Sequence, residues 1–329
     1  MKTTESRSRR RSVILNAALC LVAFGLLGLA IRSNWDQIRA VLARPINAPL
    51  FLLAFGIYMT ALVLTFCRWY VLVRALGLPF RLRDAMRLGF IGNTFNLVLP
   101  GGVGGDVIKG AFLCREQARR TQAVASMVID RALGLIGLFL LAGVSGAFIW
   151  TSADPDIRKL IVVVWAAAGA GLVGLAVLFT PALYTPFRAL VRGRGRLEVL
   201  LDELVAMAGA YRRRLGVVAA MLLAAMTTHS LFVLVFYTVS RAIFPSGLPS
   251  LGRHFLIAPL CLFTTAVPLP FGALGLSEAI SGKLFALAGH PAGAVAMMAF
   301  RVVMYASGAV SVLVYLANIR QVRDLSATE

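Results

Sequence analysis

The sequence contains few acidic residues, histidines and cysteines, and these shortages narrow the classes of function open to it. It has 14 Asp and Glu against 33 Lys and Arg, with 3 His and 4 Cys. The cysteines are scattered and three lie in apolar runs, so their spacing predicts neither a disulfide framework nor a metal site. The histidines are equally isolated, and we interpret them as structural or loop residues. We therefore expect no metal and no cofactor.

The sequence also lacks a complete nucleotide-binding motif. In the glycine-rich segment 101–110, Lys109 is followed by Gly110 rather than by Ser or Thr, so the segment is not a P-loop. Val107 stands where a dinucleotide fingerprint has its third glycine. The segment 103–106 resembles the Gly-x-Gly-Asp of intramembrane aspartyl proteases, but its first residue is Val103. We therefore expect neither an ATP-driven pump nor a protease, and no enzyme.

Apolar residues are abundant instead. They make up 59% of the chain, and the mean hydropathy is +0.84. Apolar runs longer than about 18 residues indicate membrane spans, and here they recur from end to end without the alternation of a β-barrel. The predicted fold class is therefore an all-α polytopic membrane protein with about six full spans. The predicted spans are 13–31, 49–75, 121–150, 158–179, 215–243 and 291–317.

The net charge of +19 would suggest nucleic acid in a soluble protein. In a membrane protein, the positive-inside bias of cytoplasmic loops explains it, and basic loops attract anionic lipid headgroups. We therefore expect no nucleic-acid partner. The basic residues concentrate on one side of the predicted topology, which places both termini in the cytoplasm. The expected location is a bacterial-type inner membrane.

The basic segments also divide the chain into predicted domains. A cytoplasmic tail covers residues 1–12, a first transmembrane half covers 13–180, and a basic linker covers 181–214. A second transmembrane half covers 215–319, and a cytoplasmic tail covers 320–329. In the linker, apolar residues at helical spacing predict an amphipathic helix on the cytoplasmic leaflet. These residues are Leu197, Leu200, Leu201, Leu204 and Val205.

Two stretches with proline and glycine interrupt the helical pattern, and each separates two short apolar helices. The break in segment 84–116 comprises Pro100, Gly101, Gly102, Gly104 and Gly105. The break in segment 250–290 comprises Pro270, Gly272 and Gly275. Non-helical backbone at membrane depth is tolerated only beside protein or a watery cavity, so both segments are predicted re-entrant hairpins. The two halves enter the membrane from opposite sides and are predicted inverted repeats, as in secondary transporters.

An acid follows each break, and an arginine lies in the next span. The first pair is Asp106 and Arg131, and the second is Glu278 and Arg301. An arginine at the bilayer centre costs roughly 2.5–3.5 kcal/mol, so these residues are predicted to surround one central cavity. The two acids could instead be helix caps or counter-ions of the arginines. Arginines and helix N-termini suit an anion, most naturally a phosphate.

Arg68 and Asn96 are further candidates for substrate binding. Arg68 lies late in the span 49–75, next to Trp69. It could snorkel to the cytoplasmic interface or contact a headgroup. Asn96 lies in the short apolar helix before the first break.

The order of these motifs resembles the lysylphosphatidylglycerol synthase transmembrane-domain family, also called flippase-like, which includes the flippase half of the multiple peptide resistance factor. The matching features are Arg68-Trp69, Asn96, Pro100 through Asp106, Asp130-Arg131, Pro270 through Glu278, and Arg301. The resemblance implies inverted helical halves that move a lipid between leaflets. Because the chain ends shortly after the last span, the family's aminoacyl-transferase domain is not expected here.

The expected function is a flippase-like transporter that moves a phosphate-bearing lipid or glycolipid between leaflets through a central polar cavity. Two alternatives stay open: a small-solute secondary transporter on the same scaffold, and an intramembrane transferase that acts on a lipid-linked sugar. The expected partners are membrane lipids. A homo-oligomer and a separate lipid-modifying enzyme stay open as further partners.

Overall fold

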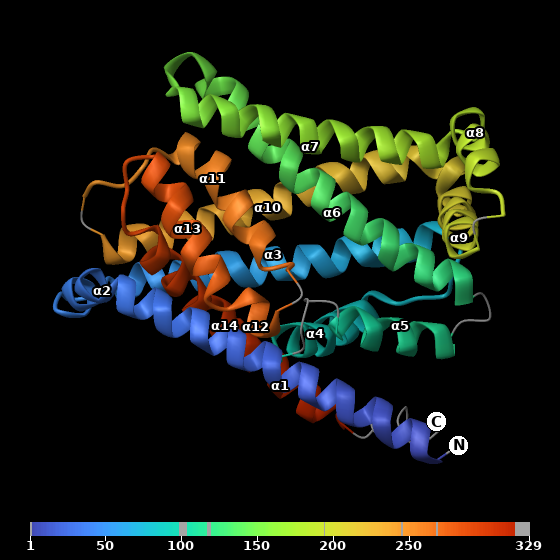
Figure 1. The fold of residues 1–329 in the computed structure, drawn as a ribbon, viewed down its shortest axis with the longest axis horizontal. Helices are drawn as coiled ribbons and strands as arrows, with labels where there is room; N and C mark the ends of the chain where they lie inside the picture. Colours follow the sequence, from blue (N-terminus) through green and yellow to red (C-terminus); the bar gives the residue numbers. More distant parts are fainter. Residues whose placement is uncertain are drawn as a thin grey trace. The chain divides into compact units, whose positions relative to one another are not determined.

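The computed structural model describes residues 2–98, 104–116, 120–193, 195–244, 246–267 and 269–319. Throughout these residues the regular structure is helical, and no strand occurs in them. Figure 1 shows the chain as a succession of long and short helices. The predicted all-α membrane class is confirmed.

Five long helical segments are apolar enough to cross a membrane, and they include most of the predicted spans. They contain α3 (Ala48–Ala75), α6 (Arg120–Ile149), α7 (Pro155–Phe179), α10 (Leu215–Ile243) and α14 (Gly293–Ala317). A sixth is formed if α1 (Lys2–Ser33) and α2 (Trp35–Leu42), which meet at a bend of 72°, count as one span. The chain is therefore a multi-pass membrane protein. The sequence did not predict α2.

Short helices flank both predicted breaks. The first lies between α4 (Leu82–Val98) and α5 (Gly104–Glu116), and Gly104 and Gly105 belong to the first turn of α5. Pro100, Gly101 and Gly102 lie outside the described residues. The second break follows α11 (Leu251–Thr264), includes α12 (Pro270–Ala273) and ends at α13 (Leu276–Leu287). Re-entry into the membrane at either place stays a prediction.

The basic linker contains two helices where the sequence predicted one. They are α8 (Pro181–Val191) and α9 (Arg196–Tyr211), and a 3-10 turn, Arg212–Arg214, follows. Gly193 and Gly195 have positive φ values of 78° and 55°, which explains why the helix does not continue between them. The apolar residues predicted for the amphipathic helix all lie within α9.

The chain forms two compact units that interleave along the sequence. Unit 1 comprises residues 1–58, 90–108 and 234–317, and unit 2 comprises 59–89, 109–233 and 318–329. Neither unit coincides with a predicted half, 13–180 or 215–319, and those halves stay a prediction.

The core of unit 1 is aromatic. The ring of Phe236 lies 5.2 Å from that of Phe285 and 5.6 Å from that of Phe300, and Tyr58 lies 5.9 Å from Phe300. Gly293 allows α14 to approach α13 closely, because a Cβ there would lie 2.4 Å from the Cβ of Phe285. Within this unit α1 packs along α12 and α13 (Figure 1), so the N-terminal helix covers the second break.

Unit 2 is organised around α6, which packs along α7 and α9. Tyr211, at the end of α9, is fully buried and donates a hydrogen bond to the Leu72 carbonyl at 3.0 Å. This bond joins the linker to α3.

Candidate functional site

The second break has an unusual backbone. Phe271, Gly272 and Ala273 have φ values of 57°, 64° and 53°, so three consecutive residues adopt the left-handed conformation. Only glycine does so freely, and a left-handed residue with a side chain costs roughly 1–2 kcal/mol. Pro270 sets the preceding φ and begins α12. The turn needs tertiary contacts to hold it.

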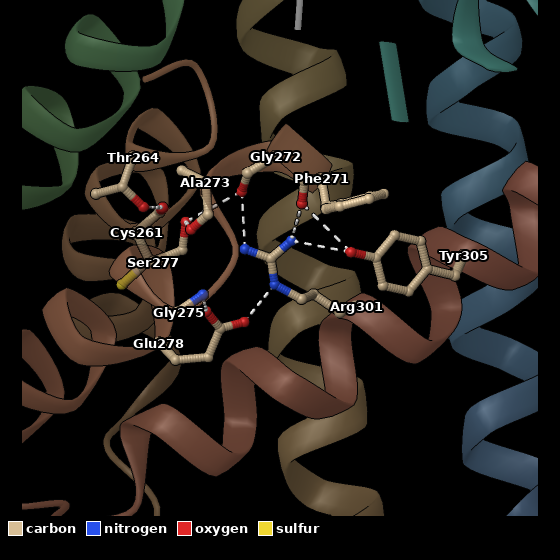
Figure 2. Close-up of polar contacts among 10 residues, drawn as sticks. All are labelled: Cys261, Thr264, Phe271, Gly272, Ala273, Gly275, Ser277, Glu278, Arg301 and Tyr305. Carbon is tan, nitrogen blue, oxygen red and sulfur yellow. Dashed lines mark hydrogen bonds and ion pairs between the residues drawn. The ribbon is translucent and has the colours of Figure 1, made fainter. Parts of the chain in front are cut away.

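Arg301 supplies those contacts from α14. Its Nε donates to a carboxylate oxygen of Glu278, its Nη1 to the Phe271 carbonyl at 2.7 Å, and its Nη2 to the Gly272 carbonyl at 2.8 Å. Figure 2 shows the guanidinium between the turn and the carboxylate. Glu278 is 0% exposed and Arg301 is 3% exposed. We call Arg301, Glu278 and the turn 271–273 the arginine clamp.

Each carboxylate oxygen of Glu278 accepts a hydrogen bond from a different element. Its second carboxylate oxygen accepts a hydrogen bond from the Gly275 backbone N–H at 2.6 Å, at the N-terminus of α13. Acids at this position satisfy an otherwise unpaired N–H and suit the positive end of the helix dipole. Glu278 is therefore both a helix cap and the counter-ion of Arg301, the two structural roles that the sequence had left open.

Two hydroxyl groups complete the clamp. The Ser277 hydroxyl donates to the Ala273 carbonyl at 3.2 Å and approaches the Gly272 carbonyl at 3.4 Å. The Tyr305 hydroxyl donates to the Phe271 carbonyl at 3.3 Å and accepts from Arg301 Nη1 at 3.5 Å. Tyr305 lies one helical turn after Arg301, so α14 presents both side chains to the break.

Helix α1 closes over the end of the turn. A Cβ at Gly275 would lie 2.3 Å from the Leu27 backbone nitrogen, and Gly275 has a φ of 83°. Both facts require glycine at this position. The Phe24 ring lies 5.5 Å from the Phe271 ring. The break is thus packed against the backbone of α1.

The first break depends on a similarly close approach, within unit 1. The Asn96 side-chain oxygen accepts a hydrogen bond from the Gly105 N–H at 2.8 Å. A Cβ at Gly105 would lie 1.8 Å from the Gly92 carbonyl oxygen, so the ends of α4 and α5 meet only with glycine there. Asp106 follows in the first turn of α5 and is half-buried. Asn96 therefore has a structural role at the break that its sequence context did not reveal.

Arg68 is paired with an acid inside unit 2. Its Nε contacts an Asp130 carboxylate oxygen at 2.7 Å, and its side chain is 6% exposed. Its Nη2 also approaches the Asp130 carbonyl at 3.4 Å. The guanidinium is directed toward α6 within unit 2. Snorkelling of Arg68 or its contact with a headgroup stays a prediction. A buried acidic partner offsets part of the cost of burying the charge of Arg68.

A histidine lies beside this second pair. Nε2 of His229 is 2.9 Å from the Gly134 carbonyl oxygen, one turn after Asp130 on α6. A Cβ at Gly134 would lie 3.5 Å from Nη2 of Arg68, an ordinary van der Waals distance, so this part of α6 lies beside the guanidinium. Helices α3, α6 and α10 therefore bring a basic, an acidic and an imidazole side chain to one part of unit 2.

Of the two acid–arginine pairs noted in the sequence, the structure joins one, and it adds two contacts that the sequence did not predict. It joins Glu278 to Arg301, Asn96 to the glycines of the first break, and Arg68 to an acid. Arg131 is half-buried on α6 in unit 2, whereas Asp106 belongs to unit 1. The single cavity shared by all four charged residues therefore stays a prediction.

Sequence reasoning missed three participants. Asp130 was noted only as the neighbour of Arg131, although an acid deep in a span needs a partner. Tyr305 was overlooked, although it lies four residues after Arg301 and so on the same helix face. The carbonyls of the left-handed turn carry no sequence signal beyond Pro270 and the glycines. In the described part of the chain, no group of three or more His, Cys, Asp or Glu could hold a metal ion.

The fold and this site define a class: a multi-pass, all-α membrane protein in which a broken helix is held by a buried arginine–glutamate pair. The chain belongs to the family described as the lysylphosphatidylglycerol synthase TM region, whose sequence model matches residues 13–311. The expected resemblance is confirmed, and it indicates a lipid-related function in the membrane. No curated protein and no solved structure matched the chain.

Proposed function

We propose that this protein moves a phosphate-bearing lipid or glycolipid between membrane leaflets and is not an enzyme. The observation that carries the proposal is the arginine clamp. Arg301 is 3% exposed within an apolar helix, yet it binds a non-helical break beside an acid. Charged residues at broken helices in membrane proteins mark substrate pathways, and the family membership points to a lipid as the substrate.

In the proposed mechanism the headgroup enters a polar site at the breaks while the acyl chains stay in lipid. Arg301 and Arg131 contribute positive charge to the phosphate. Asp106 and Glu278 keep the helix ends in place, and either could carry a proton. The turn 271–273 is strained. In the proposed cycle the second break has two arrangements, one in which Arg301 holds this turn and one in which the turn is released. Exchange between them would open the site toward alternate leaflets.

The proposal includes an orientation. The protein lies in a bacterial-type inner membrane with both termini cytoplasmic. Segments 84–116 and 250–290 are re-entrant hairpins of two inverted halves. A lipid with a net charge would couple transport to the membrane potential, at about 2.3 kcal/mol per charge per 100 mV.

The test is lipid translocation in proteoliposomes that contain the purified full chain. A panel of headgroup-labelled phospholipids and neutral glycolipids is compared for the wild type, Arg301→Gln and Arg131→Gln. Arg213→Gln is the matched control, because Arg213 is exposed in the 3-10 turn after α9. We expect headgroup-dependent translocation that the control retains and both other variants lose. Translocation no faster than in protein-free vesicles for every lipid would refute the proposal.

A further inference from the structure

One edge of the Arg301 guanidinium, the edge that carries Nη1, faces a partly exposed residue. The edges that carry Nε and Nη2 face Glu278 and the Gly272 carbonyl, both inside the core. The Nη1 edge faces Tyr305, whose side chain is 38% exposed. Figure 2 shows Tyr305 across the guanidinium from Glu278. A ligand that approaches the clamp from outside the core therefore reaches the Tyr305 edge first.

The contacts that the Tyr305 hydroxyl makes at this edge are long. Nη1 donates to the Phe271 carbonyl at 2.7 Å, but its distance to the Tyr305 hydroxyl is 3.5 Å, at the limit of a hydrogen bond. The Tyr305 hydroxyl donates to the same carbonyl at a long 3.3 Å. Because the carbonyl already has its short bond from Arg301, the hydroxyl proton can turn away without leaving the carbonyl unsatisfied.

We propose that Nη1 of Arg301 and the hydroxyl of Tyr305 form a subsite for one phosphate group. A phosphate oxygen accepts from the second N–H of Nη1 and from the Tyr305 O–H. Glu278, Phe271 and Gly272 keep their short bonds to the guanidinium, so every buried polar atom of the clamp stays paired. Charge-assisted bonds of this kind are the stronger class.

This edge is favoured over the usual two-pronged arginine–phosphate geometry. A phosphate on the Nε and Nη2 edge would displace Glu278, which is 0% exposed and would be left as an unpaired buried charge. An ammonium group offers no acceptor to either donor of the subsite. The subsite therefore favours an anionic acceptor such as phosphate over an ammonium group. This inference rests on the proposed function for its lipid source, since free phosphate has the same chemistry.

The test measures binding and transport separately on the full chain. Binding is followed as thermal stabilisation in detergent by three probes: a short-chain phosphatidylglycerol, a short-chain neutral glycolipid and inorganic phosphate. The variant is Tyr305→Phe, which removes only the hydroxyl. Tyr315→Phe is the control, because Tyr315 lies on the same helix with its ring 5.5 Å from the Phe95 ring.

We expect Tyr305→Phe to weaken binding of the phosphate-bearing probes about tenfold, equivalent to ~1.4 kcal/mol, and to leave glycolipid binding unchanged. The tighter of the two phosphate probes identifies the source, lipid headgroup or free phosphate. Unchanged phosphate binding in Tyr305→Phe overturns the subsite, even if the wild type translocates lipid. Phosphate binding that depends on Tyr305 in a protein that translocates no lipid supports the subsite and refutes the proposed function.

Discussion

Replacing Arg301 by Met separates the structural role of the clamp from its role in transport. The substitution keeps an unbranched, apolar side chain on α14 but removes the charge and three donors. The Phe271 carbonyl keeps the Tyr305 hydroxyl as a donor at 3.3 Å. The Ser277 hydroxyl lies 3.4 Å from the Gly272 carbonyl and can donate to it by turning from the Ala273 carbonyl. The main loss is therefore the counter-ion of Glu278, a carboxylate that is 0% exposed.

The expected magnitude follows from that burial. Removing one partner of a buried ion pair costs about 3–5 kcal/mol, because the other charge stays uncompensated. Glu278→Gln alone should also cost about 3–5 kcal/mol, since it leaves the guanidinium of Arg301, which is 3% exposed, without its acid. The double variant has no stranded charge, and Gln at 278 can still accept from the Gly275 N–H. We expect the two substitutions to couple by about 2–3 kcal/mol.

The assay is equilibrium unfolding of the four chains in detergent, followed by circular dichroism. An exposed pair gives the control: Lys159 and Asp156 lie 2.9 Å apart with side chains 77% and 67% exposed. Lys159→Met should leave the stability almost unchanged, because solvent screens an exposed ion pair. If the clamp variants are additive to within about 0.5 kcal/mol, the pair is not the electrostatic unit described above and the reasoning fails.

Three further predictions concern packing, the second ion pair and pH. Gly275→Ala should lower the free energy of unfolding by more than about 2 kcal/mol, because the new Cβ is strained at this φ and collides with α1. Gly216→Ala, where a Cβ has open space around it, should leave that free energy unchanged in the same unfolding assay. Asp130→Asn should lower the free energy of unfolding by about 2–4 kcal/mol, because it leaves Arg68 buried without an acid. Combining Asp130→Asn with Arg68→Met should recover part of that loss. Burial lowers the pKa of His290, in the connection between α13 and α14, below its ordinary 6.5. The unfolded chain then takes up the proton first as pH falls through 6.5, so stability should decline below that pH. His290→Gln should flatten the decline, and an identical pH profile for the two proteins would contradict the assignment.

The helices could be predicted from the sequence because their cause is local. A span must be apolar for about 18 residues or more, so run length alone identifies the membrane helices. Pro270 and the glycines around it likewise indicate a break, because their backbone preferences act at the residue itself. The depth of Arg301 followed from its place within an apolar run. The family could also be recognised from the sequence, because it is identified by the order of these motifs along the chain.

The sequence analysis did not predict two local features, the bend after α1 and the division of the linker into two helices. The bend of 72° between α1 and α2 has no proline or glycine at its junction. The division of the linker into α8 and α9 occurs at Gly193 and Gly195, whose positive φ values overrode the helical spacing of the flanking leucines.

Only the tertiary structure decided which charges pair. Arg68 and Asp130 lie on different helices, and nothing within either helix indicates the other. Glu278 could have been a cap or a counter-ion, and folding made it both, because its two oxygens point to different elements. Helix packing decides which residue partners a buried charge. The reason is that the electrostatic energy of an ion pair depends on the distance between the two charged groups and not on their separation in sequence.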